Sequence, residues 1–206
     1  MTNANHDRTD NRDQVMQPGP QQQGGSQLNS QTLNRYFECL TKGDYLGMQA
    51  CLHPEVHFSD VGFDLRRREV GAMWHMIISH GIQVVVGDKK VEGQAATAHW
   101  ECDYQFRKDE TAAPRRVHNV VDSSFRFEDG LIREQHDDCD FWRWFEQAIG
   151  PIGKGAHMFD VLEDKLEQLL KRELPLDVEE KVRAKVKITA RQKIDGFIKA
   201  HPEYAG

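Results

Sequence analysis

The sequence of 206 residues lacks any apolar run that approaches the length of about 18 residues expected for a membrane-spanning helix. It also lacks an excess of basic residues, since 27 Lys and Arg stand against 33 Asp and Glu and the net charge is −6. A protein that binds nucleic acid usually presents a basic face, so we expect no nucleic acid partner. Residues 1–13 are polar and contain no apolar core of a secretory signal. We therefore expect a cytoplasmic protein that does not bind a membrane.

The patterns of the common metal and cofactor sites are also absent. Only four cysteines are present, and they form neither a CxxC pair nor a zinc-ligand spacing. The phosphate-binding pattern GxGxxG and the Walker loop do not occur. Two pairs of possible ligands, His136 with Asp138 and His118 with Asp122, are incomplete sets for a metal. We expect no metal, no cofactor and reduced, mostly buried thiols.

Composition divides the chain into three parts. Residues 1–30 are rich in Gln and Asn and poor in apolar side chains, which predicts a disordered tail because little surface can be buried there. Residues 31–153 contain all four tryptophans and are the predicted folded domain. Residues 154–206 form a C-terminal extension with two apolar stripes at helical spacing, in 159–169 and 178–198. We expect a helical pair that packs on the domain or on a second subunit.

The middle part is predicted to begin with helices and to continue with strands. Helical spacing or capping residues mark the first group, and alternating apolar and polar residues mark the second. The expected helices are 33–42, 44–52 and 69–80, and the expected strands are 56–60, a strand from 83, 96–106, 117–127 and 131–144. Helices followed by a largely antiparallel sheet predict an α+β fold.

Three motifs in this domain resemble one protein superfamily. They are Arg35–Asp44, His53–Asp60 and Arg126–Ile132, and their order and spacing are similar to those of the SnoaL-like, ketosteroid-isomerase-like branch of the nuclear transport factor two superfamily. The ending Asp140–Trp144 resembles a bacterial subgroup of that branch. The resemblance covers residues 32–150 and implies a cone-shaped fold, in which three helices wrap a strongly curved sheet around an apolar pocket.

The resemblance implies roles for three residues. Tyr36 and Asp60 are 24 residues apart and match the oxyanion donor and the base of the ketosteroid isomerases, while Asp137 matches the acid/base of SnoaL-type cyclases. A carboxylate in an apolar cone has a raised pKa and takes up protons more effectively. The alternatives are a core aromatic at Tyr36, a turn residue at Asp60, and a solvated rim around Asp137. The second oxyanion acid falls on Asp122 or on Ser123, so we predict no steroid isomerase activity.

Further residues are expected to surround a ligand. Asn119 would orient it, and four aromatic residues would line the pocket: Trp74, Trp100, Tyr104 and Phe125. The other face of the sheet, with His99 and His118 on neighbouring strands, is expected to be exposed or to form a homodimer interface. His75 and His80 are expected to be structural.

Two functions follow from these expectations. The first is the binding of a small apolar molecule, with cofactor-independent acid/base chemistry if the protein is an enzyme: isomerisation, cyclisation, dehydration or epoxide hydrolysis. The second is a non-catalytic module for protein association. An open cavity that Asp60 and Tyr36 reach favours the first, and a cone filled by Trp74, Trp100 and Phe125 favours the second.

Overall fold

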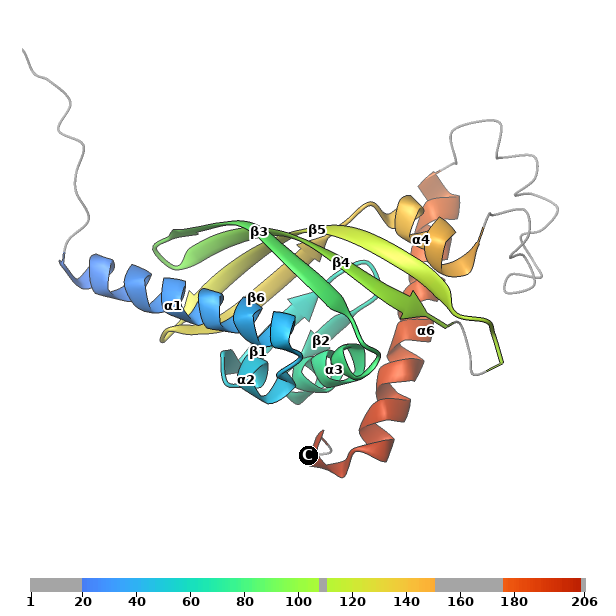
Figure 1. The fold of residues 1–206 in the computed structure, drawn as a ribbon, viewed down its shortest axis with the longest axis horizontal. Coiled ribbons are helices and arrows are strands. Elements are labelled where there is room, and N and C mark those ends of the chain that lie inside the picture. The colour runs from blue at the N-terminus through green and yellow to red at the C-terminus, as the bar shows by residue number, and fades with distance from the viewer. Residues whose placement is uncertain (1–19, 108–110, 151–175, 205–206) are drawn as a thin grey trace, which may run out of the picture.

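The computed structural model describes residues 20–107, 111–150 and 176–204 of the chain. Within these ranges, helices precede most of the strands, and further helices follow the last strand (Figure 1). The elements in chain order are α1 (Pro20–Lys42), α2 (Tyr45–Gln49), β1 (Leu52–Ser59), β2 (Asp64–Arg66), α3 (Arg68–Ser79), β3 (Gln83–Glu92), β4 (Ala95–Phe106), β5 (Arg115–Glu128), β6 (Leu131–Asp138), α4 (Phe141–Ile149), α6 (Leu176–Ala200) and the 3₁₀ turn η2 (Pro202–Tyr204).

The strands form one mixed sheet in the order β2-β1-β6-β5-β4-β3. Neighbouring strands are antiparallel except β1 and β6, which are parallel. The sheet is strongly curved, and α1, α2 and α3 lie on one of its faces (Figure 1). A break in the register of β3 between Val86 and Lys89 adds to the curvature, because such irregularities bend a strand. The predicted α+β cone is confirmed.

The apolar core lies between the helices and the inner face of this sheet. In β4, the alternate residues Ala96, Ala98, Trp100 and Cys102 are buried, as the period of two predicts. In β5 the same alternation buries Phe125 and Phe127 together with the polar Ser123. The rings of Tyr36 and Phe37 from α1 meet Phe125 edge to face. The core thus joins the first helix to the middle of the sheet.

The N-terminal helix begins earlier than the sequence suggests. Helix α1 starts at Pro20, so residues 20–30 are helical and the expected tail cannot extend beyond residue 19; residues 1–19 lie outside the described part. Two side chains attach this helix to turns of the sheet. Asn29 donates to the carbonyl of Gly93 at 2.8 Å, and Thr32 donates to the carbonyl of Gly130 at 2.6 Å. Such tertiary hydrogen bonds are invisible to composition, which explains the error.

Two other boundaries differ from the predictions. The last strand, β6, ends at Asp138 and not near Trp144. The carboxylate of Asp140 accepts a hydrogen bond from the backbone N–H of Arg143 at 3.0 Å and caps α4, so a helix replaces the end of the predicted strand. The second helix, α2, ends at Gln49, and β1 begins at Leu52.

The C-terminal extension is helical where the structure describes it. Helix α6 contains the second predicted stripe, of which Val182, Val186 and Ile194 are buried. It runs beside α3, and η2 also contacts α3 (Figure 1). The extension therefore packs on the domain of the same chain; the first stripe, 159–169, lies outside the described residues.

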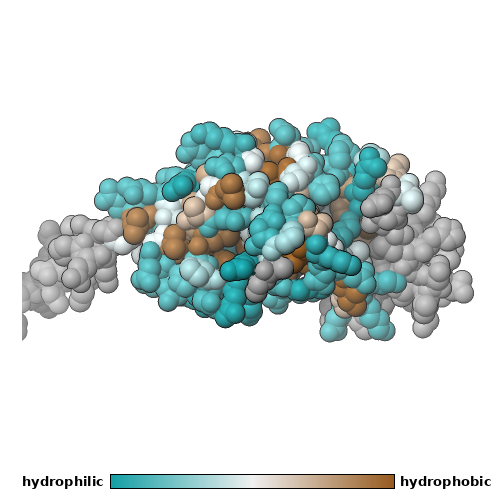
Figure 2. All heavy atoms as spheres, turned by 90° about the horizontal axis from the view of Figure 1, so that it is seen from below, coloured by the Kyte–Doolittle hydropathy of each residue, from teal (hydrophilic) through white to brown (hydrophobic). Residues whose placement is uncertain are grey.

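Polar residues cover most of the visible surface. Seen from below, the molecule is largely hydrophilic, with small separate apolar areas (Figure 2). None of the helices in the described ranges has the length and apolar character that would let it cross a membrane.

Candidate functional site

A cavity of about 270 Å³ lies inside the cone. Its wall is mostly apolar and is formed by side chains from α3, the inner face of the sheet, α4 and α6. This volume is close to the lower limit of about 300 Å³ for small-molecule sites. Two tryptophans that were candidates for filling the cone, Trp74 and Trp100, line the cavity. The polar residues of the wall include Asp60, Asn119 and Asp137.

Asp137 is the most deeply buried carboxylate of the site. Its position on the inner face of β6 leaves it only 7% exposed, while its neighbours His136 and Asp138 are exposed. Ser123 donates a hydrogen bond to Oδ1 at 2.6 Å, and the amide of Gln135 donates to Oδ1 and Oδ2 at 2.9 and 3.1 Å. Burial raises the pKa of Asp137 to about 7, although these two donors act in the opposite direction.

Asp60 occupies the turn between β1 and β2. Its Oδ1 accepts hydrogen bonds from the backbone N–H groups of Gly62 at 2.7 Å and Phe63 at 2.5 Å, as in an Asx turn. Desolvation raises the pKa of Asp60 to about 6, and the two backbone donors limit the rise. The two interpretations of this residue are therefore compatible: Asp60 shapes a turn and also contributes a carboxylate to the cavity.

The two carboxylates influence each other through the cavity. The negative charge of Asp60 contributes to the raised pKa of Asp137. The pKa of Asp137, about 7, lies above that of Asp60, about 6, so Asp60 ionises first and Asp137 keeps its proton to higher pH. A base and an acid that differ in this way can take up and deliver protons on one bound molecule.

Tyr36 does not line the cavity. It is fully buried, and its hydroxyl donates to Oε1 of Gln135 at 2.8 Å. The amide nitrogen of Gln135 in turn donates to Asp137. The structure thus places Tyr36 behind Asp137, where it holds Gln135, and does not bring it to the ligand space as the resemblance implied.

The other predicted lining residues divide into two groups. Trp74, Trp100, Tyr104 and Asn119 lie in the cavity wall. Phe125 does not; its ring packs in the core against Tyr36 and Phe37. The deciding factor is position along the sheet, since Phe125 lies near the β5–β6 turn, whereas the β5 residues in the cavity wall, Asn119 and Val121, lie farther from that turn.

Several functional side chains were absent from the sequence predictions. Ser123 connects two predicted site residues, because it accepts from Nε1 of Trp100 at 2.8 Å while donating to Asp137. The alternation in β5 placed Ser123 on the inner face, so a signal for its role existed. The cavity wall also includes Val186, Thr189, Ala190 and Lys193 of α6. No local pattern could have shown where that helix packs.

Helix α4 contributes one further polar contact to the wall. Nε1 of Trp144 donates to the hydroxyl of Tyr104 at 2.8 Å, and both residues line the cavity. This hydrogen bond joins α4 to β4 and satisfies the buried polar ends of two large aromatic side chains.

The outer face of the sheet is polar. His99 lies opposite Asp122 and is 2.8 Å from its carboxylate, and His118 lies opposite Asp103 at 3.2 Å. The two histidines do not lie opposite each other on these neighbouring strands, because the β4–β5 register pairs each with an acidic residue.

Comparisons with known proteins agree with this architecture. A search of curated proteins finds no match. Among solved structures, a candidate polyketide cyclase from a Silicibacter species is 25% identical, with 59% of this chain and 95% of that chain covered and a TM-score of 0.50. An LEH-like epoxide hydrolase from M. tuberculosis is 19% identical, with 60% and 90% covered and a TM-score of 0.50. A candidate SnoaL-like polyketide cyclase from a Jannaschia species is 15% identical, with 66% and 99% covered and a TM-score of 0.52.

The amino-acid sequence also matches a known protein family. The SnoaL-like domain matches residues 33–135, from the middle of α1 to the buried Gln135 of β6. This segment is half of the chain and contains the cone but neither α4 nor α6. The chain therefore belongs to the family of SnoaL-like domains.

Proposed function

We propose that the cavity binds a small, largely apolar molecule and that Asp60 and Asp137 perform cofactor-independent acid/base chemistry on it. One observation carries the proposal: two carboxylates with raised pKa values reach the same apolar cavity. The similarity of the fold to a candidate polyketide cyclase and an LEH-like epoxide hydrolase supports the same reaction class. We expect a proton-transfer reaction: isomerisation, cyclisation, dehydration or epoxide opening.

Asp60 is the base in this proposal. Both backbone donors bind its Oδ1, so Oδ2 is the oxygen available to a proton of the substrate. Because its pKa of about 6 lies below neutral pH, the carboxylate is ionised before the reaction. The mostly apolar wall strengthens the interaction between this charge and the substrate.

Asp137 is the acid. Its Oδ1 accepts from both Ser123 and Gln135, whereas Oδ2 accepts from Gln135 alone, which favours a proton on Oδ2 when the group is protonated. That proton can pass to a carbonyl or epoxide oxygen as negative charge develops there. Ser123 and Gln135 hold the carboxyl in one orientation, and Tyr36 holds Gln135 through its own hydrogen bond. Tyr36 is therefore a positioning residue.

The competing interpretation, a non-catalytic association module, depended on a filled cone. The side chains of Trp74 and Trp100 border an open cavity, which favours ligand binding. A homodimer through the outer face of the sheet stays a prediction, as does the location in the cytoplasm. Light scattering on the wild-type chain measures the mass in solution, and a monomeric mass would contradict the dimer.

The experiment that tests the proposed function has two stages. Native mass spectrometry of the purified chain first identifies any co-purified molecule, and a panel of small epoxides and cyclisable polyketide-like ketones is then assayed for turnover. We expect Asp137→Asn and Asp60→Asn each to lower kcat by at least about a hundredfold, the usual contribution of a general acid or base. Asp122→Asn, on the exposed outer face, is the matched control and should retain the wild-type rate. Turnover that survives both substitutions would refute the assigned roles.

A further inference from the structure

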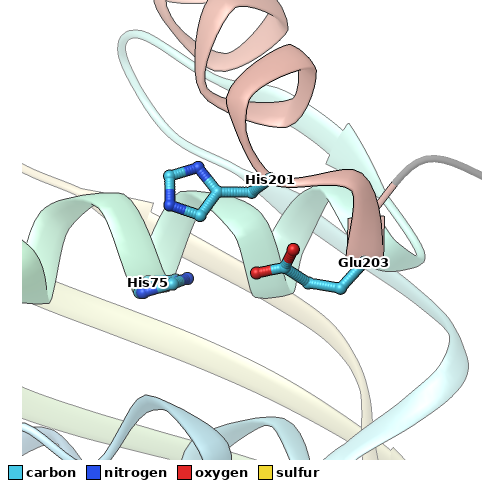
Figure 3. A group of neighbouring side chains, drawn as sticks. All are labelled: His75, His201 and Glu203. Atoms are coloured by element: carbon cyan, nitrogen blue, oxygen red, sulfur yellow. The ribbon is translucent and has the colours of Figure 1, made fainter.

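A second group of chemically active side chains lies outside the cavity. His75 comes from α3, His201 follows α6, and Glu203 lies in η2. One possible ligand atom of each residue lies within 4.8 Å of those of the other two. Figure 3 shows the two rings and the carboxylate turned toward one another from two separate segments of the chain. His75 was expected to be structural, and its distance in the sequence from His201 and Glu203 explains why the cluster was not predicted.

The protonation of His201 is determined by its backbone partner. Nδ1 of this ring lies 2.9 Å from the carbonyl oxygen of Phe197. A carbonyl oxygen can only accept, so the proton is on Nδ1 and the lone pair is on Nε2. Histidines that bind metals commonly donate their second ring N–H to a backbone carbonyl in this manner. His201 therefore has the tautomer that a metal ligand needs.

His75 is held in a similar way by side chains. Its Nδ1 lies 3.2 Å from the hydroxyl oxygen of Tyr204, and that oxygen also accepts a hydrogen bond from Nε2 of Gln49 at 2.7 Å. In the tautomer in which Nδ1 of His75 donates to this phenol oxygen, Nε2 keeps the lone pair that a metal needs. Tyr45 stacks on the His75 ring at 3.7 Å between ring centroids, with 7° between the planes. Packing and hydrogen bonding thus fix this ring in one orientation.

The cluster offers two imidazole nitrogens and one carboxylate oxygen as ligand atoms. The carboxylate supplies the negative charge that a divalent ion attracts.

We propose that His75, His201 and Glu203 bind one divalent ion of the zinc type. Two imidazoles and one carboxylate are a known ligand set for Zn²⁺, with water as the fourth ligand. In a tetrahedral site with bonds of about 2.0 Å, ligand atoms are about 3.3 Å apart. Since Glu203 is exposed, its side chain can move to close the remaining distance.

The position of the site indicates what the ion would do. His75 lies between Trp74 and Met76 of α3, and α3 and α6 both contribute to the cavity wall. An ion held by His75 on one side and by His201 and Glu203 on the other connects α3 to the C-terminal end of α6. The ion would thus stabilise the packing of α6 against the cone, with a structural role independent of the proposed acid/base chemistry.

The test measures zinc binding by the full chain without a polyhistidine tag. The protein is first dialysed against a chelator, and ZnCl₂ is then titrated by calorimetry. We expect one ion per chain and a rise in melting temperature with zinc. His201→Ala and Glu203→Gln should each weaken binding by at least about tenfold, the loss that follows even from removing an outer partner of a metal ligand. His80→Ala, an exposed residue at the end of the same helix as His75, is the matched control and should bind as the wild type does.

The outcomes separate this site from adventitious binding, which ten histidines in the chain make a real competitor. Absence of stoichiometric binding by the wild type overturns the proposal. Equal affinity of wild type, His201→Ala and Glu203→Gln overturns it as well, because the zinc would then bind elsewhere. If His201→Ala does not fold, Glu203→Gln still decides, since this substitution changes an exposed side chain by one atom. Replacement of Zn²⁺ by Co²⁺ should give the visible absorption of a four-coordinate site with nitrogen and oxygen ligands.

Discussion

Tyr36 and Asp137 are connected through one residue between them, Gln135. The hydroxyl of Tyr36 donates to Gln135 at 2.8 Å, and the Gln135 amide donates to Asp137 at 2.9 Å. Because all three side chains are buried, this connection is shielded from water and has a defined geometry. The resemblance to ketosteroid isomerases had placed Tyr36 in contact with a ligand, whereas in the structure Tyr36 supports Asp137 through Gln135.

Removal of the Tyr36 hydroxyl should lower stability. In Tyr36→Phe, Oε1 of Gln135 loses its donor in the core, at a cost of about 1–3 kcal/mol in the free energy of unfolding. Urea denaturation measures this change. Tyr45→Phe removes a hydroxyl from a half-buried tyrosine of the neighbouring helix and is the control, with an expected change below about 0.5 kcal/mol. Equal stability of Tyr36→Phe and wild type would contradict the role of the hydroxyl.

Loss of the Ser123 hydroxyl should raise the pKa of Asp137 further. The hydrogen bond from Ser123 favours the ionised carboxylate and lowers the pKa of Asp137, so Ser123→Ala removes an interaction that opposes the effect of burial. Carboxyl carbon NMR during a pH titration measures the shift directly. Ser124→Ala, the exposed next residue on the same strand, is the control. An unchanged midpoint in Ser123→Ala would show that this hydrogen bond does not govern the acid.

Stability should fall as pH rises from about 4 to 7. The folded-state pKa of Asp137, about 7, and that of Asp60, about 6, both lie above the ordinary value of 3.8. Over this range the folded chain binds more protons than the unfolded chain, and stability decreases with pH where that is so. The stabilisation by the protonated carboxyls is complete below pH 4 and is lost as the pH rises past the two folded-state pKa values.

The substitution Asp137→Asn isolates one of these two contributions. It replaces the buried acid by a neutral side chain of similar shape. The decrease in the free energy of unfolding between pH 4 and 7 should therefore become smaller by up to several kcal/mol, since each pKa unit corresponds to about 1.4 kcal/mol. Denaturant unfolding across this pH range is the measurement, and Asp138→Asn on the exposed face is the control. A pH profile identical to that of wild type would contradict burial of a titrating Asp137.

Helix α6 should control access to the cavity. Ala190 lies in the cavity wall, and its Cβ is 3.7 Å from where a Cβ on Gly62 would lie. Ala190→Phe is expected to occupy part of the space and to weaken binding of an apolar fluorescent dye by about tenfold, which corresponds to 1.4 kcal/mol. Ile188→Phe adds an aromatic ring on the exposed side of the same helix and should leave dye binding unchanged. Equal dye binding by both variants would contradict the contribution of α6 to the cavity wall.

Local patterns in the sequence were sufficient for most of the architecture. The period of two in β4 and β5 identified the inner face correctly, including the unusual placement of Ser123 among apolar residues. The same alternation separated Asp137 from the exposed His136 and Asp138. Such patterns are reliable because backbone geometry alone sends successive side chains of a strand to opposite faces.

The tertiary structure decided which of these residues work together. Tyr36, which was expected to contact the ligand, contacts Gln135 instead. Phe125 is not in the cavity wall, whereas residues of α6 are. His75 lies close to His201 and Glu203. Each of these relationships joins segments that are distant in the chain. Local geometry specifies the face on which a side chain lies, but only the packing of whole elements against one another specifies its neighbours.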